Sequence, residues 1–209
     1  MTTQFHRSDE DLIGDYTEGD HAALRLLIER YHDPLIAFLI RMMGTRSEAE
    51  DVFQDTFLQI HQSLDSFDQT RRFKPWLFTI AANKGRDALR KRKRRHTVSL
   101  SAPIDHDGGE LVDLLDIDVP EVGVEIEREE QSAMVQKALD ELTPRLREIL
   151  LLAYFQKMSY AQVAEIFGIP IGTVKSRLHA AVAKFAQKWQ EQLDAKNRES
   201  ENRSAGESG

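Results

Sequence analysis

Apolar residues recur at intervals of three and four positions along most of the chain, which is the spacing that places them on one face of an α-helix. Few segments alternate apolar and polar residues as a half-buried strand does. One continuous apolar stripe runs from Leu24 to Met42, and Gly44 follows it where a helix end is expected. The pattern predicts an all-α protein whose first helices lie between Asp9 and Met43.

Two further helices are expected before residue 96. The spacing of Ser47 and Glu50 is typical of a capping box and predicts that a helix begins there. Another helix carries Trp76 and Leu77 inward and ends in the basic run Arg90–Arg95. Four helices with apolar faces can enclose one small core, so we assign residues 9–95 to a first domain.

The helical periodicity fades over residues 96–130, where prolines and a glycine pair interrupt any helix and eleven acidic residues accumulate. We expect a flexible acidic linker there. Periodicity returns over residues 131–193, which we assign to a second small helical domain. Residues 194–209 are polar without apolar periodicity, and we expect them to form a disordered tail.

The segment Ser159–Phe185 predicts a short helix, a tight turn at Gly168 and a longer second helix. Ala164 is small enough for the second helix to cross closely over it, and Val174 would anchor that helix in the core. This spacing is typical of a helix-turn-helix, whose second helix enters the DNA major groove. A three-helix bundle with a solvated basic face is the alternative. The outward side of the second helix carries Thr173, Lys175, Ser176, Arg177, His179 and Lys184.

A second candidate nucleic-acid surface lies between Arg71 and His96, which contains eleven Lys or Arg residues and one acid, Asp87. Aromatic and amide side chains interleave with these cations: Phe73, Trp76, Phe78 and Asn83. Positive charge, stacking surface and base-edge amides are together typical of single-stranded DNA recognition. A solvated basic face is the alternative. The acidic interval after it explains why the net charge is nevertheless -7.

Other chemistry finds little support in the sequence. The absence of cysteine excludes disulfides, thiolate metal sites and cysteine nucleophiles. The seven histidines fall at no metal-ligand spacing, so we expect no metal, no cofactor and no enzyme activity. No apolar run is long enough to span a membrane and the N-terminus lacks a signal-peptide pattern, so we expect a cytoplasmic protein without membrane insertion. An operator-binding regulator and a pure protein-interaction module remain as alternatives.

Three segments in order carry a family resemblance: AEDVFQDTFLQIHQSLDSF, RRFKPWLFTIAANKGRDALRKRKRR and LTPRLREILLLAYFQKMSYAQVAEIFGIPIGTVKSRLHAAVAKF. An acidic interval precedes the third segment. In this order and spacing, the sequence over about residues 9–189 closely resembles the extracytoplasmic-function (ECF) group of bacterial sigma factors. The resemblance implies an initiation factor that directs core RNA polymerase to promoters and helps to melt them. It also implies a contact near the polymerase flap and control by an anti-sigma factor.

The resemblance further implies three binding surfaces. The first docks on the clamp helices of the polymerase largest subunit and consists of Asp51, Gln54, Asp55 and Leu58. The second captures a base flipped from the minus-ten element, beside DNA phosphates, and consists of Phe67, Arg71, Arg72, Trp76, Asn83, Lys84, Arg86 and Arg90. The third enters the major groove at the minus-thirty-five element and consists of Thr173, Lys175, Ser176, Arg177 and His179.

Two positions depart from what many members of that family carry. Ala180 stands on the recognition helix where a basic residue is common, which puts the minus-thirty-five sequence preference in doubt. Asp87 lies amid the basic segment, and we expect it to pair with Arg90 or Lys91 one turn further on.

Overall fold

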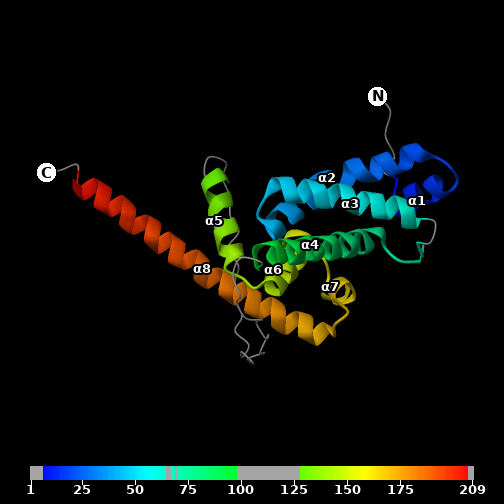
Figure 1. Cartoon of the computed structure of the whole chain (residues 1–209). Helices are drawn as coiled ribbons and strands as arrows, with labels where there is room; N and C mark the ends of the chain where they lie inside the picture. The colour runs from blue at the N-terminus through cyan, green and yellow to red at the C-terminus, as the bar shows by residue number, and fades with distance from the viewer. Residues whose placement is uncertain (1–6, 65–66, 69, 98–127, 207–209) are drawn as a thin grey trace.

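The computed structural model describes residues 7–64, 67–68, 70–97 and 128–206, and within these ranges every regular element is a helix (Figure 1). The prediction of an all-α fold is therefore confirmed. The expected acidic linker falls mostly on residues 98–127, which lie outside the described residues. Among the described helices, none is long and apolar enough to cross a membrane.

The first domain consists of α1 (Asp9–Thr17), α2 (His21–Met43), α3 (Arg46–Ser63) and α4 (Phe73–Thr97). Helix α2 packs against the other three, and α3 also packs against α4. At the centre, the rings of Phe38 and Phe78 meet edge to face with centroids 5.3 Å apart. Gly85 lies where α4 crosses α2, since a Cβ there would come within 3.0 Å of the Met42 side chain. The close crossing fixes which face of α4 remains outside the core.

The turn between α2 and α3 confirms one predicted helix end and corrects a predicted start. Gly44 ends α2 in the left-handed conformation, with φ 84°. Helix α3, however, begins at Arg46 with Thr45 as its N-cap, so the predicted start at Ser47 is wrong. Because the glycine reverses the chain at once, Thr45 alone takes the extended conformation before the next helix. Its hydroxyl donates to Glu48 Oε2 at 2.8 Å.

The second domain contains α5 (Arg128–Asp140), α6 (Pro144–Leu150), a π-helical turn η2 (Leu151–Phe155), α7 (Tyr160–Phe167) and α8 (Ile171–Gly206). Ser159 caps α7 through a capping box with Gln162. Gly168 ends α7 in the left-handed conformation, with φ 62°. Val174 on α8 is fully buried and Ala164 on α7 nearly so, at 0% and 9% exposed. The predicted helix-turn-helix is therefore present, and we call α5–α8 the helix-turn-helix domain.

Helix α8 continues to Gly206, beyond residue 193 where the sequence pattern placed the end of the domain (Figure 1). The structure is therefore helical from residue 194 to Gly206, where we expected a disordered tail. Polar contacts one turn apart support this extension: Gln190 Nε2 donates to Asp194 at 2.9 Å, and Arg198 Nε donates to the carbonyl of Asp194 at 3.1 Å. Such pairs stabilise a helix without any apolar stripe, so periodicity alone does not reveal it.

The two domains lie against each other. Figure 1 shows α6 and α7 beside α4, while the far end of α8 projects away from the first domain. Helix α4 contacts α7, and α2 contacts both η2 and α6. The domain boundaries expected from the sequence stay close to those of the helices, but α4 extends to Thr97 and α5 already begins at Arg128.

Candidate nucleic-acid interface

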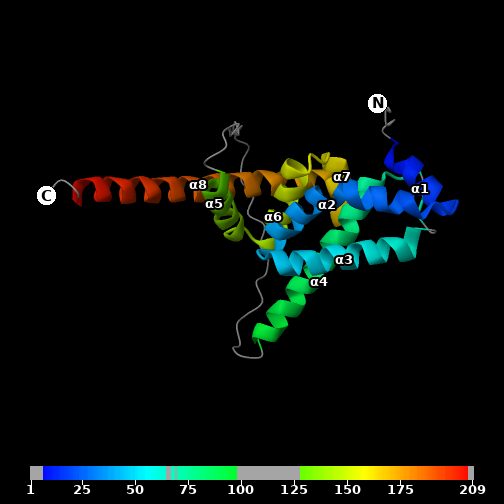
Figure 2. The same ribbon diagram turned by 90° about the horizontal axis from the view of Figure 1, so that it is seen from above.

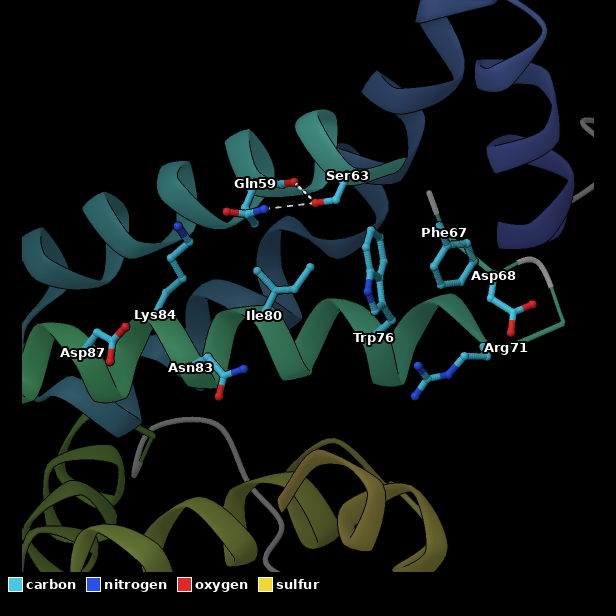
Figure 3. Close-up of a pocket in the computed structure, with 10 residues that line it drawn as sticks. All are labelled: Gln59, Ser63, Phe67, Asp68, Arg71, Trp76, Ile80, Asn83, Lys84 and Asp87. Carbon is cyan, nitrogen blue, oxygen red and sulfur yellow. Dashed lines mark hydrogen bonds between the residues drawn. The ribbon is translucent and has the colours of Figure 1, made fainter. Parts of the chain in front are cut away.

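A pocket of about 480 Å³ lies between α3 and α4, beside the segment that leads into α4 (Figure 3). Five of the eight residues assigned to the minus-ten surface line it, so the structure brings most of that set together. Its full lining consists of Gln59, Ser63, Phe67, Asp68, Arg71, Trp76, Ile80, Asn83, Lys84 and Asp87. The pocket combines an aromatic wall with amide, cationic and carboxylate groups.

The aromatic wall consists of Phe67 and Trp76, whose ring centroids lie 4.5 Å apart at an interplanar angle of 41°. Phe67 is buried, at 8% exposed, whereas Trp76 is partly open to the pocket. Phe73 and Phe78, which the sequence analysis grouped with the stacking surface, are both 0% exposed. Both lie in the core, where the ring of Phe73 contacts Tyr31 and the ring of Phe78 contacts Phe38. Among these aromatic residues of α4, Trp76 is therefore the one that lines the pocket.

The segment leading into α4 is held by local hydrogen bonds, as far as its described residues show. Asp68 Oδ1 accepts the backbone N–H and the hydroxyl of Thr70, at 2.9 and 2.7 Å. These bonds lower the pKa of the exposed Asp68 carboxyl. The backbone N–H of Arg71 donates to the carbonyl of Asp68 at 3.0 Å. The resulting turn sets Phe67 and Arg71 at the edge of the pocket.

The opposite wall comes from α3, which the sequence analysis did not assign to DNA. Gln59 Nε2 donates to Ser63 Oγ at 3.1 Å, and Ser63 Oγ donates to the carbonyl of Gln59 (Figure 3). The sequence shows that Gln59 and Ser63 lie one helical turn apart, but no local pattern indicates that this side of α3 faces Trp76. The crossing of α3 and α4 places these side chains opposite Trp76.

Three residues assigned to the minus-ten surface lie outside the pocket. Arg90 pairs with Asp87, which confirms the expected partner of that carboxylate. Arg72 is exposed and lines a crevice between the domains that Gln162 and Glu165 border from α7. Arg86 lies on the side of α4 that faces the helix-turn-helix domain. The predicted set is therefore divided between a pocket and an interdomain contact.

In that contact, Arg86 Nη1 donates to both carboxylate oxygens of Glu148 on α6, at 3.0 and 3.3 Å. A second N–H of Arg86 donates to Asn83 Oδ1, and its guanidinium lies 5.5 Å from the ring centre of Phe167 on α7. Glu148 is only 1% exposed. Burial raises the pKa of Glu148 to about 7, against the opposing effect of Arg86 and Arg145.

The five residues predicted to contact the minus-thirty-five element lie in the first turns of α8, the second helix of the helix-turn-helix. Lys175 and Ser176 are exposed, whereas Thr173, Arg177 and His179 are partly buried. Ser176 Oγ donates to the carbonyl of Thr173 at 3.1 Å. The Lys175 ammonium lies 6.0 Å from the ring centre of Tyr160. Arg177 Nη1 is buried and has no hydrogen-bond partner.

On α3, Asp51, Gln54, Asp55 and Leu58 are all exposed on one face. Leu58 is 56% exposed, which is unusual for a large apolar side chain on a polar helix face. Val52, next to Asp51 in the chain, points away from this face and is buried at 4% exposed. Within the described part of the chain, no cluster of three or more His, Asp or Glu side chains could hold a metal ion.

Comparison with known proteins finds matches to both domains. Residues 27–95 match the family model Sigma-70 region 2, and residues 132–185 match Sigma-70, region 4. The chain is 32% identical to the ECF RNA polymerase sigma factor SigW of Bacillus subtilis, over 80% of this chain and 89% of that protein. It is 35% identical to the RNA polymerase sigma factor NccH of Alcaligenes xylosoxydans, over 85% and 92% of the two chains.

Solved structures extend the comparison to the fold. CnrH in complex with the cytosolic domain of CnrY has a TM-score of 0.65 at 25% identity, covering 90% of this chain and 99% of that one. The sigma factor RpoE in complex with the anti-sigma factor NepR, from Bartonella quintana, has a TM-score of 0.61 at 28% identity, covering 79% and 96%. The chain belongs to the ECF sigma factors of bacterial RNA polymerase.

Proposed function

We propose that this protein directs core RNA polymerase to specific promoters and assists promoter melting through its first domain. The observation that carries the proposal is the pocket beside Trp76, on a domain that matches Sigma-70 region 2 and in a chain that also holds a helix-turn-helix. Two DNA contacts on one chain strengthen each other, because binding of the second becomes intramolecular.

The pocket between α3 and α4 is proposed to hold a base flipped from the non-template strand of the minus-ten element. Flipping costs a few kcal/mol of lost stacking and pairing. Stacking on Trp76 offsets about 1 to 3 kcal/mol of this for each base, and the Asn83 amide and Lys84 ammonium are available for the base edge and a phosphate. Arg71, Arg72, Arg86 and Arg90 are assigned to the nearby backbone.

The outward side of α8 is proposed to enter the major groove at the minus-thirty-five element. Lys175 and Ser176 are exposed near the start of the helix, which is where recognition helices contact bases. We assign these two and His179 to base edges, and Thr173 and Arg177 to the DNA backbone. Such contacts position the protein on duplex DNA before it melts.

The exposed face of α3 is proposed to dock on the clamp helices of the polymerase largest subunit. Leu58 supplies an apolar centre, and Asp51 and Asp55 supply charges for a basic partner. The helix-turn-helix domain is proposed to bind near the polymerase flap. An anti-sigma factor that covers these faces is a further proposed partner, because RpoE was solved bound to the anti-sigma factor NepR.

We assign the protein no catalytic activity or cofactor of its own, since the polymerase performs the chemistry of initiation. Its place of action is then the cytoplasm, where the polymerase transcribes. In this proposal residues 9–95 bind the polymerase and the minus-ten element, residues 96–130 act as a flexible acidic linker, and residues 131–193 bind the minus-thirty-five element.

Run-off transcription with bacterial core RNA polymerase tests the proposal, using candidate promoters from the protein's own regulatory region. Transcripts that start at one position and require the protein are the expected result. Binding of the protein to core polymerase is measured in parallel. Failure to bind core polymerase, together with tight binding of duplex DNA by the protein alone, would instead identify an operator-binding regulator.

A further inference from the structure

The pocket beside Trp76 contains an amide that a neighbouring side chain holds in one orientation. Asn83 on α4 lines the pocket, and its Oδ1 accepts a hydrogen bond from Nη2 of Arg86, one helical turn further on. Arg86 itself is not part of the pocket lining. Figure 3 shows the amide nitrogen of Asn83 on the side of Trp76 and the amide oxygen turned away from α3. The pair therefore joins a pocket residue to a residue behind it.

The chemistry of the partner decides which end of the amide faces it. A carboxamide carries a donor nitrogen and an acceptor oxygen, and a half-turn of the group exchanges the two. An unrestrained amide can therefore meet either a donor or an acceptor on a base. A guanidinium has donors only, so Arg86 can bind the oxygen of Asn83 but not its nitrogen. The nitrogen of Asn83 is left on the pocket side as a fixed donor.

Arg86 is held in place through a different nitrogen. Its Nη1 donates to both carboxylate oxygens of Glu148, at 3.0 and 3.3 Å, and its guanidinium lies 5.5 Å from the ring centre of Phe167. Asn83 and Arg86 are both on α4, so their bond depends on the geometry of one helix. A guanidinium has five N–H donors, so Arg86 can hold Asn83 through Nη2 and contact a phosphate through another nitrogen.

Two further donors of the pocket are less suited to reading a base. Gln59 Nε2 already donates to Ser63 Oγ, at 3.1 Å. Lys84 carries its ammonium on a flexible stem, which follows base edges and phosphates alike. Within the described part of the chain, no protein group accepts a hydrogen bond from the amide nitrogen of Asn83. A donor that is fixed in direction and unused by the protein is suited to read an acceptor on a base.

We propose that Arg86 is a positioning residue of this pocket: it holds Asn83 Oδ1, so that the amide nitrogen of Asn83 donates to the captured base. The inference rests on the proposed function, because it concerns the same pocket. The captured base must then present a ring nitrogen or a carbonyl oxygen toward Asn83. A base with an amino group at that place is disfavoured, because two donors would face each other. Arg86 thereby controls base preference in addition to any contact with a phosphate.

The test measures base preference with the complex of the full-length protein and core polymerase. The probe is a fluorescein-labelled non-template strand of about 20 nucleotides, taken from the promoter that run-off transcription identifies. Each minus-ten position carries each of the bases in turn. Fluorescence anisotropy gives the ratio of affinities for the best and the worst base at each position. We expect the wild type to show a ratio of about tenfold at the captured position.

Arg86→Gln is the decisive variant, because a glutamine amide can face either atom of Asn83 and no longer fixes it. The ratio at the captured position should fall to about threefold. Arg86→Lys still offers donors only, so it should keep most of the ratio. The matched control, Arg90→Gln, also removes one positive charge from α4. It should weaken binding of all bases alike and leave the ratio unchanged, as loss of a phosphate contact does.

Asn83→Asp tests the donor itself and keeps Arg86, so it decides the question if the Arg86 variants do not fold. Arg86 then holds one carboxylate oxygen, and the other oxygen faces the base as an acceptor. The preference should move to a base with an amino group at that edge. An unchanged preference in Asn83→Asp would overturn the inference. So would a ratio in Arg86→Gln that equals the ratio in Arg90→Gln.

The outcomes separate this inference from the proposed function. Transcription that requires the wild-type protein, together with an unchanged ratio in Arg86→Gln, would overturn the positioning role alone. A wild-type protein that neither binds core polymerase nor supports transcription would overturn the proposed function, and this inference with it.

Discussion

The outer side of α8 and the basic side of α4 are both assigned to DNA, yet they differ in how their cations are engaged. On α8, Lys175 is exposed, and its ammonium lies 6.0 Å from the ring centre of Tyr160. On α4, Arg86 is bound by the buried Glu148, and Arg90 by Asp87. Lys175 and Ser176 of the proposed minus-thirty-five surface are thus presented to solvent, whereas Arg86 and Arg90 of the proposed minus-ten surface are paired with carboxylates from within the chain.

The difference indicates an order of events. A surface with free cations can meet duplex DNA at once, and long-range attraction to phosphates speeds that encounter. A surface whose cations are paired must first exchange carboxylates for phosphates. We therefore expect duplex recognition by α8 to precede base capture by the pocket beside α4.

The largest effect is expected for Trp76→Ala in the pocket. Loss of the stacking ring should reduce open-complex formation about tenfold to hundredfold, because the flipped base loses its main contact, while closed-complex binding changes little. Fluorescence of 2-aminopurine within the minus-ten element measures opening, and a gel-shift assay measures closed binding. Trp189→Ala on α8 is the matched control. Equal loss in both assays would contradict a role confined to melting.

The next effect concerns the acid that holds Arg86. Since burial raises the pKa of Glu148 from 4.5 to about 7, the folded protein binds this proton more tightly than the unfolded chain does. The resulting stability is present below pH 4.5 and is lost as the pH rises through about 7. Its size is on the order of 3 kcal/mol.

Urea unfolding of the wild type and of Glu148→Gln at pH 5 and at pH 7.5 checks this expectation. The wild type should lose more unfolding free energy than the variant between these two values, because the amide does not titrate. Identical losses in both proteins would show that Glu148 is not the group responsible.

A smaller effect is expected for Lys175→Ala on α8. Closed-complex binding should fall about fivefold to tenfold, with a weaker salt dependence, while the opening rate of the complexes that form stays nearly constant. The gel-shift assay at several salt concentrations measures this, with Lys137→Ala on α5 as a control for the loss of one positive charge. A slower opening step with unchanged closed binding would contradict the order proposed above.

The smallest effect is expected for Asp87→Asn on the rim of the pocket. The substitution frees Arg90 from an exposed ion pair, and exposed pairs contribute little, so single-stranded DNA should bind about twofold more tightly. Fluorescence anisotropy with a fluorescein-labelled single-stranded DNA of about 20 nucleotides detects such a change. Asp33→Asn, which also removes an exposed carboxylate, should leave the affinity closer to that of the wild type.

Local features of the sequence were sufficient to predict much of the fold. The helix-turn-helix follows from Ala164, Gly168 and Val174, because a small residue, a left-handed turn and an apolar anchor act within a few residues of one another. The capping box of Ser159 has the same local character. The start of α3 and the helical extension of α8 were missed, since a reversal at Gly44 and polar pairs along α8 leave no apolar signal.

The helices, their inward faces and the type of side chain available for DNA can be inferred from the sequence, because these depend on residues one to four positions apart. The tertiary structure is needed to see that Phe78 is core while Trp76 faces a pocket, because the crossing of α2, α3 and α4 selects the covered side. It also decided that Arg86 meets Glu148, a residue 62 positions away. Such a pairing depends on how whole domains pack, which no local pattern of charge or hydrophobicity specifies.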